Sequence, residues 1–324
     1  MNPSSVDRPV TRRVAARAGL VGNPSDGFGG AVLAAPIPAL EACLTATASE
    51  GVSITGSGVS ERWPSVAAWR AQIDRAGVHG PQRIITASLW VLVGHLRRSH
   101  PDHADRAGVD IRWHTDVPMS VGLAGSSALT VGLIDAVSSI AALALSAERD
   151  VLGIAAGWQD RVVQAFGRPV LVDAAAMTEL DGVIVPDVHV VVPRPVRLVV
   201  GWKPDAATSS DDYHAPLRRD ARGLAVPMSE LAALARDATG RLERGDLDGF
   251  GAAVDTGWRI RQSCVPLRAD HAEIVELVRA TGVAATTPGS GGSVVAVCPD
   301  DNAADRVHAR LGSAGCRAID VAIG

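Results

Sequence analysis

The strongest constraint on the fold of this chain is a glycine-rich stretch at residues 116–128, DVPMSVGLAGSSA. It follows an alternating segment typical of a strand and precedes an Ala/Leu-rich segment typical of a helix. Gly122 and Gly125 lack a Cβ, so a ligand can approach the backbone closely there. Ser126 and Ser127 fall at the start of the predicted helix, where free N–H groups and the helix dipole favour an anion. The stretch therefore predicts either a phosphate-binding loop or a glycine-rich turn that only caps a buried helix.

Two common phosphate loops do not match this stretch. The chain has a single lysine, Lys203, in Trp-Lys-Pro, so a Walker loop with its Gly-Lys pair is excluded. The dinucleotide pattern G-x-G-x-x-G is also absent, because serines follow Gly125.

The stretch resembles instead the ATP-phosphate loop of the GHMP kinases, a family that includes galactokinase, homoserine kinase, mevalonate kinase and phosphomevalonate kinase. That loop reads Pro-x-x-x-Gly-Leu-x-Ser-Ser-Ala, and this chain keeps the residue types with one extra residue between the leucine and the serines. The resemblance implies ATP binding at Pro118, Gly122, Leu123, Ala124, Gly125, Ser126, Ser127 and Ala128.

Composition narrows the class of protein. The 324 residues carry a formal net charge of −4, with 47% hydrophobic residues, which is typical of a water-soluble globular protein without the basic surplus of a nucleic-acid binder. The four cysteines form no C-x-x-C pair and are expected to be buried in a reducing cytoplasm. No signal peptide is recognisable in the first ten residues, and no apolar run reaches the roughly 18 residues of a membrane span. We therefore expect a cytoplasmic protein with no membrane or nucleic-acid partner.

Hydrophobic periodicity predicts a mixture of helices and strands, which is the α+β class. We expect a disordered arm at residues 1–12, an N-terminal domain at 13–192 and a C-terminal domain at 193–324. A loop is expected at residues 56–64. Strands are expected at residues 13–22, 31–47, 51–55, 109–115, 169–173, 182–185, 196–202, 283–286, 293–298 and 316–321. Helices are expected at residues 65–77, 82–98, 126–145, 147–166 with interruptions at Gly153 and Gly157, 213–238, 246–262, 269–281 and 303–313.

A second motif, ARAGLVGNPSDGFGG, occupies residues 16–30. By itself it predicts a strand closed by a turn, since Asn-Pro and Asp-Gly are ordinary turn formers. It is also similar to the first GHMP motif, which has a basic residue five positions before a glycine and an aspartate four positions after it. Arg17, Gly22 and Asp26 keep both spacings. The resemblance implies that Arg17 lies near the transferring phosphate, and that Asp26, with Asn23 and Gly22, binds the hydroxyls of a sugar.

Glu148 and the run GWQDR at residues 157–161 form a third pattern. By themselves these charges are typical of a solvated helix face. In GHMP kinases a glutamate that binds Mg²⁺ precedes the aspartate of a Gly-x-x-Asp sequence by eleven or twelve residues, and Glu148 precedes Asp160 by twelve. The resemblance implies that Glu148 and Ser127 bind Mg²⁺ and that Asp160 takes the hydroxyl proton. An aspartate can suffice as base because phosphoryl transfer depends mostly on positioning and charge neutralisation.

A fourth stretch, TTPGSGGSVVAV at residues 286–297, reads either as a glycine turn between two strands or as the third GHMP motif, which closes over the phosphates. The resemblance implies ATP contacts at Gly289, Ser290 and Gly291. The stretch departs from the family pattern Lys-x-Thr-Gly, because Pro288 precedes Gly289. Since proline has no N–H, we expect one phosphate contact to be missing.

These motifs keep the family order along residues 16–300 and most resemble the glucuronokinase-like sugar kinases. The resemblance implies a ribosomal-S5-like N-terminal domain, a ferredoxin-like C-terminal domain, and ATP- and Mg²⁺-dependent phosphorylation of a sugar or sugar acid, at the anomeric hydroxyl. One alternative is a GHMP kinase for homoserine or an isoprenoid acid. Another is a catalytically inactive GHMP-fold regulator. Small sugars or uronic acids and ATP are the expected partners, with a homodimer as one option for the assembly.

Overall fold

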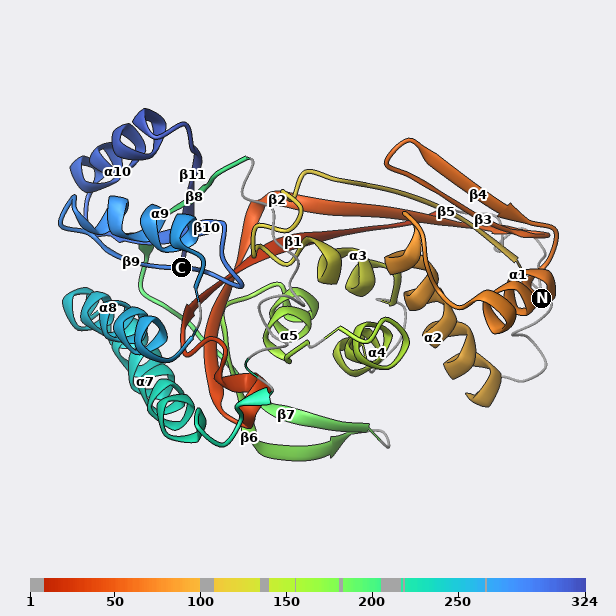
Figure 1. The fold of residues 1–324 in the computed structure, drawn as a ribbon, viewed down its shortest axis with the longest axis horizontal. Coiled ribbons are helices and arrows are strands. Elements are labelled where there is room, and N and C mark those ends of the chain that lie inside the picture. The colour runs from red at the N-terminus through yellow and green to blue at the C-terminus, as the bar shows by residue number, and fades with distance from the viewer. Residues whose placement is uncertain are drawn as a thin grey trace.

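The structure is a computed structural model, and it describes residues 9–99, 108–134, 140–154, 156–180, 183–204, 217, 219–265 and 267–324. The strands and helices form two sheets with their covering helices (Figure 1). No helix within these ranges is both long and apolar enough to cross a membrane.

The first sheet has seven strands in the order β4-β3-β5-β2-β6-β7, and β1 pairs with β2 outside this path. Its strands are β1 (Val10–Val21), β2 (Ala31–Ser49), β3 (Val52–Gly56), β4 (Val59–Trp63), β5 (Gly108–Thr115), β6 (Val170–Leu180) and β7 (Val183–Val190). The helices of this half are α1 (Val66–Ala76), α2 (Arg83–Ser99), α3 (Gly125–Ile134), α4 (Ile140–Ser146) and α5 (Gln159–Phe166).

Two interruptions in the pairing of β1 with β2 direct the end of β1 toward the interior. Ala15 pairs with Glu41, but the next residue of β1, Ala16, pairs with Ile37, so β2 has extra residues at this point. Such bulges bend a strand, and Pro36 and Pro38 of β2 also lack the N–H of a regular ladder. Both strands change direction near this point in Figure 1, and helices α3 to α5 lie inside the bend.

The second sheet has four antiparallel strands in the order β11-β8-β10-β9. They are β8 (Val196–Trp202), β9 (Ala284–Thr286), β10 (Ser293–Cys298) and β11 (Arg317–Ile323). The helices of this half are α7 (Ala225–Arg244), α8 (Leu247–Cys264), α9 (Ala269–Arg279) and α10 (Asp301–Ser313). This arrangement confirms the predicted α+β fold with two sheets.

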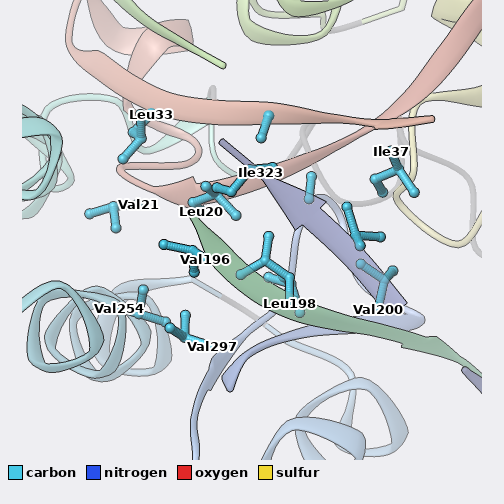
Figure 2. Close-up of a cluster of buried hydrophobic side chains, with 14 of the residues drawn as sticks. Leu20, Val21, Leu33, Ile37, Val196, Leu198, Val200, Val254, Val297 and Ile323 are labelled. Atoms are coloured by element: carbon cyan, nitrogen blue, oxygen red, sulfur yellow. The ribbon is translucent and has the colours of Figure 1, made fainter. Parts of the chain in front are cut away.

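One hydrophobic cluster joins the two halves. It contains Leu20 and Leu33 of the first sheet together with Leu198 of β8 and Val254 of α8, and Figure 2 shows these side chains packed around one another. The predicted boundary at residues 192/193 falls between the two sheets, and the core continues across it. The division into domains stays a prediction, but the shared core holds the two halves in a defined relation.

Three expectations about the chain need correction or limits. The loop predicted at residues 56–64 is wrong, because β4 pairs with β3 through a two-residue turn at Ser57 and Gly58, both with positive φ, as tight hairpins require. The disordered arm is wrong for Val10 to Arg12, whose backbone pairs with β2. Residues 1–8 lie outside the described ranges, as do 135–139 of the helix predicted at 126–145 and most of residues 213–218 in the helix predicted at 213–238.

Candidate active site

A cavity of about 550 Å³ brings the sequence motifs together. Its wall includes the end of β1, the turn after it, the glycine loop before α3 and the start of α5. The predicted site residues that line it are Arg17, Asn23, Asp26, Gly122, Leu123, Ala124, Gly125, Ser126, Ser127, Glu148, Asp160 and Ser290.

Five other predicted site residues, all within the described ranges, do not line this cavity. Gly22 has φ +100°, and a Cβ there would meet the carbonyl oxygen of Ala31 at 2.4 Å, so this glycine permits the close approach of two strands. The residues outside the cavity lining are Gly22, Pro118, Ala128, Gly289 and Gly291.

The glycine loop before α3 has the strained backbone that its sequence indicates. Gly122 has φ +81° and Ala124 has φ +60°, both in the left-handed region. A Cβ on Gly122 would lie 3.0 Å from the backbone nitrogen of Ser290, so the loop packs directly on the second glycine loop. A Cβ on Gly125 would instead approach the side chains of Met119 and Val117. The conformation therefore depends on Gly122 more than on Gly125.

Arg17 connects three motifs through its guanidinium. Its Nε donates to Oδ1 of Asp160 at 2.6 Å, and its Nη1 donates to the carbonyl oxygens of Gly122 at 2.9 Å and Pro288 at 2.6 Å. The side chain is buried. The planar fork of arginine suits such a set of acceptors, so Arg17 fixes the position of Asp160 relative to both glycine loops.

Arginine side chains bind three consecutive carbonyl groups of the second glycine loop, at residues 287–289. Arg261 of α8 donates to the carbonyl oxygens of Thr287 at 2.7 Å and Gly289 at 2.9 Å. The Pro288 oxygen also accepts the Gly19 N–H at 2.8 Å. Pro288 therefore lacks an N–H, and its carbonyl is already bound by Arg17.

Sequence reasoning missed Arg261. Its place on the apolar face of a helix, three residues after Trp258, was a signal of a buried charge.

Ser127 and Glu148 meet at the base of the cavity. The Ser127 hydroxyl donates to Oε1 of Glu148 at 3.0 Å, and both residues are buried. Glu148 lies on a short π-helix, Ala147–Val151, a distortion that often marks functional positions. A hydroxyl and one carboxylate fit Mg²⁺, which prefers oxygen ligands and commonly takes its remaining ligands from substrate phosphates and water. Among the described residues there is no group of three or more His, Cys, Asp and Glu that could hold a metal without such help.

Arg161 is the second arginine that sequence reasoning left without a role. Its guanidinium forms an ion pair with Glu148, and its Nη1 donates to the carbonyl oxygen of Gly157 at 2.8 Å. Burial, and then the positive charge of Arg17, lower the pKa of Arg161 to about 9. Its only sequence signal was its position directly after Asp160.

The turn after β1 presents Asp26 and Asn23 to the cavity. The Asp26 carboxylate accepts the backbone N–H of Gln159 at 2.9 Å, and Asn23 Nδ2 donates to the Gln159 side chain at 2.7 Å. Burial raises the pKa of the Asp26 carboxyl, and the bond from Gln159 partly offsets this. A Cβ on Gly157 would lie 2.2 Å from Oδ2 of Asp26, so the glycine of GWQDR makes room for this carboxylate. Asp26 and Asp160 are thus held on one wall of the cavity.

Comparison with protein families identifies two matches in chain order. A model described as GHMP kinases N terminal domain matches residues 87–168, and one described as GHMP kinases C terminal matches residues 232–317. Together they match just over half of the chain. A curated relative, Glucuronokinase 1 of Arabidopsis thaliana, is 26% identical over 314 residues, which is 90% of this chain and 85% of the relative.

Solved structures show the same fold. Streptococcus pneumoniae phosphomevalonate kinase in complex with phosphomevalonate and AMPPNP has a TM-score of 0.76 at 13% identity, covering 97% of this chain and 100% of that one. Lactococcus lactis galactokinase complexed with galactose has a TM-score of 0.72 at 16% identity, covering 98% of this chain and 93% of that one. At these identities the likeness concerns the fold alone.

Proposed function

This chain belongs to the GHMP kinases, and we propose that it transfers a phosphoryl group from ATP to a hydroxyl of a sugar or sugar acid. The anomeric hydroxyl is the proposed acceptor. The observation that carries the proposal is the placement of Asp26 and Asp160 on one cavity wall, linked through Gln159 and beside the glycine loop before α3. In such a pair, one carboxylate can bind hydroxyl groups of the substrate while the other accepts the proton of the attacking hydroxyl.

Asp26 and Asn23 support a polyhydroxylated substrate. A buried carboxylate accepts hydrogen bonds from hydroxyl groups, and an amide offers both a donor and an acceptor. A carboxylate in this position suits a sugar better than homoserine or an isoprenoid acid, which have fewer hydroxyls. The relatives named as glucuronokinases make a uronic acid the first candidate.

Asp160 is proposed to accept the proton of the attacking hydroxyl. Its Oδ1 is bound by Arg17, which leaves Oδ2 available to the substrate side of the cavity. Arg17 orients the carboxylate and adds positive charge where the phosphoryl group passes. In phosphoryl transfer such positioning and charge stabilisation supply most of the catalysis.

The loop from Gly122 to Ser127 is proposed to bind the triphosphate at the N-terminus of α3. Ser127 and Glu148 would hold Mg²⁺, which bridges phosphate oxygens and neutralises charge when it is bound. The two glycine loops pack on each other at Gly122, so nucleotide binding at the first loop would also affect the conformation of the second. The cytoplasmic location and the homodimer stay predictions.

A substrate panel tests this function. The purified protein is incubated with ATP, Mg²⁺ and, in turn, neutral hexoses, uronic acids, homoserine and mevalonate, and ADP release is measured. We expect the highest kcat/KM with a uronic acid, and phosphorylation at the anomeric position by nuclear magnetic resonance of the product. The highest turnover with homoserine or mevalonate would contradict the assignment of a sugar substrate, and a lack of turnover with the whole panel would favour the inactive regulator.

The variant Asp26→Asn separates the two ends of the cavity in the same assay. It should raise the sugar KM by roughly tenfold or more, because a charge-assisted hydrogen bond contributes about 1.5–3 kcal/mol. The KM for ATP should change little. A higher KM for ATP with an unchanged KM for the sugar would show that the turn after β1 binds the nucleotide.

A further inference from the structure

Glu148 has a counter-ion of its own in this fold. The carboxylate is 2% exposed, with Oε1 bound by the Ser127 hydroxyl and Oε2 paired with Arg161. Removal of one partner from a buried ion pair is strongly destabilising, because the remaining charge is left buried and unpaired. The guanidinium of Arg161 therefore occupies one of the two oxygens that a metal would need.

Arg161 has one buried donor that is not used in these contacts. Its Nη1 donates to the Gly157 carbonyl, whereas its buried Nε has no hydrogen-bond partner among the described atoms. Oδ2 of Asp160 lies 3.8 Å from Nη1, beyond hydrogen-bond distance. The side chain also lines the cavity, so an anion in the cavity could reach it. A nucleotide phosphate is such an anion.

We propose that Arg161 is an internal counter-ion that keeps Glu148 closed to free divalent cations, and that Glu148 opens only when nucleotide phosphate gives Arg161 another anionic partner. The proposal rests on the proposed metal role of Glu148. A carboxylate already neutralised by a guanidinium attracts a divalent cation weakly, and the guanidinium repels the same cation at short range. The protein then takes its metal together with the nucleotide.

Manganese binding to the nucleotide-free protein tests this directly. Mn²⁺ is titrated into wild type and Arg161→Gln, and free Mn²⁺ is measured by electron paramagnetic resonance. Removing a cation next to a buried carboxylate should tighten Mn²⁺ binding by about tenfold or more. Arg161→Lys, which keeps the charge, should bind Mn²⁺ like wild type. Unchanged or weaker binding by Arg161→Gln would overturn the proposal, because Arg161 would then support Glu148 as a ligand.

Arg83→Gln is the matched control. Arg83 is an exposed arginine at the start of α2 that lines the same cavity, and the structure gives it no ion pair within the described ranges. Replacement of Arg83 by Gln removes the same formal charge and leaves the ion pair of Glu148 with Arg161 intact. Mn²⁺ affinity should change by less than about threefold. An equal gain in both variants would mean that only the general charge of the cavity matters, which also contradicts the proposal.

Thermal unfolding keeps the test decisive if Arg161→Gln folds poorly. Its Tm without metal should fall below that of wild type, because Glu148 is left buried and unpaired, and Mn²⁺ should restore it. The double variant Glu148→Gln/Arg161→Gln should recover much of the Tm without metal. A double variant as unstable as Arg161→Gln would refute the pairing as the cause.

The proposed function is tested by different readouts. Wild-type turnover on the substrate panel tests the kinase activity, and Glu148→Gln tests the metal role through the affinity for the Mn²⁺–ATP complex. The wild type could be active, with a Mn²⁺–ATP affinity that depends on Glu148, while Arg161→Gln binds free Mn²⁺ as wild type does. That result would contradict the counter-ion role of Arg161 and leave the proposed kinase function standing.

Discussion

The two glycine loops of the cavity have similar composition and different orientation. The loop before α3 lines the cavity from Gly122 to Ser127 and ends in a helix N-terminus. The loop between β9 and β10 directs the carbonyl groups of Thr287, Pro288 and Gly289 to two arginines, and among the described residues of this loop only Ser290 lines the cavity. The resemblance implied phosphate contacts for both loops, but the first loop supplies six residues of the cavity wall, from Gly122 to Ser127, and the second supplies only Ser290 among its described residues.

Arg17 binds Asp160 and also a carbonyl group of each glycine loop, and Asp160 is the proposed base. Asp160→Asn should therefore lower kcat by about 10²–10⁴-fold, the usual contribution of a general base. The amide oxygen can still accept the Arg17 N–H, so ATP affinity should stay close to that of wild type. Steady-state kinetics measure both. A near-wild-type kcat would mean that Asp160 serves only as an anchor for Arg17.

Gly122→Ala addresses the contact between the loops. Its Cβ would lie 3.0 Å from backbone atoms of Ser290 and Gly291, at a φ of +81°. We expect ATP affinity to fall by about tenfold or more, since such backbone strain costs of order 1–3 kcal/mol. Calorimetric titration with a non-hydrolysable ATP analogue measures it.

The control for this substitution is Gly125→Ala in the same loop. A Cβ there approaches only the side chains of Met119 and Val117, and α3 begins at this residue. Its effect on affinity should be clearly smaller. Equal losses in the two variants would show that the packing of one loop on the other is unimportant for the nucleotide.

Arg261→Met tests whether the second loop is held from behind. The variant loses hydrogen bonds from a charged donor to two carbonyl groups, and we expect a destabilisation of about 3 kcal/mol, seen as a Tm lower by several degrees. Arg259→Met, on the exposed side of the same helix, is the matched control and should leave the Tm nearly unchanged. Similar Tm values for the two variants would argue against a supporting role for Arg261.

Pro288→Ala should change ATP affinity least, and it tests whether the two glycine loops differ in phosphate binding. The alanine restores an N–H, but the carbonyl of this residue remains bound by Arg17 and by the Gly19 N–H. ATP affinity should stay within about threefold of wild type, because residue 288 is buried and does not line the cavity, so its restored N–H has no direct access to a phosphate there. A gain of tenfold or more would show that the second loop lacks only this N–H to bind phosphate, and that the two loops act alike.

Local sequence signals predicted much of the fold and of the candidate site. The match of their spacing to the GHMP motifs pointed to Arg17, Asp26, Glu148 and Asp160, and all four line one cavity. Strand alternation located β5 and β10 to within a residue or two. The hairpin of β3 and β4 was missed because its strands are short and its Ser-Gly turn was read as the start of a loop.

Features that depend on neighbours in the chain follow directly from the sequence: the glycines that permit positive φ, the helix start after Gly122, and the spacing from Glu148 to Asp160. The partners of the arginines depend on the tertiary structure. Arg17 donates to the carbonyl oxygen of Pro288, 271 residues later in the chain, and Arg161 pairs with Glu148, a buried residue of a π-helix. A buried guanidinium takes whichever acceptors the packed core brings within reach, and no local pattern specifies them.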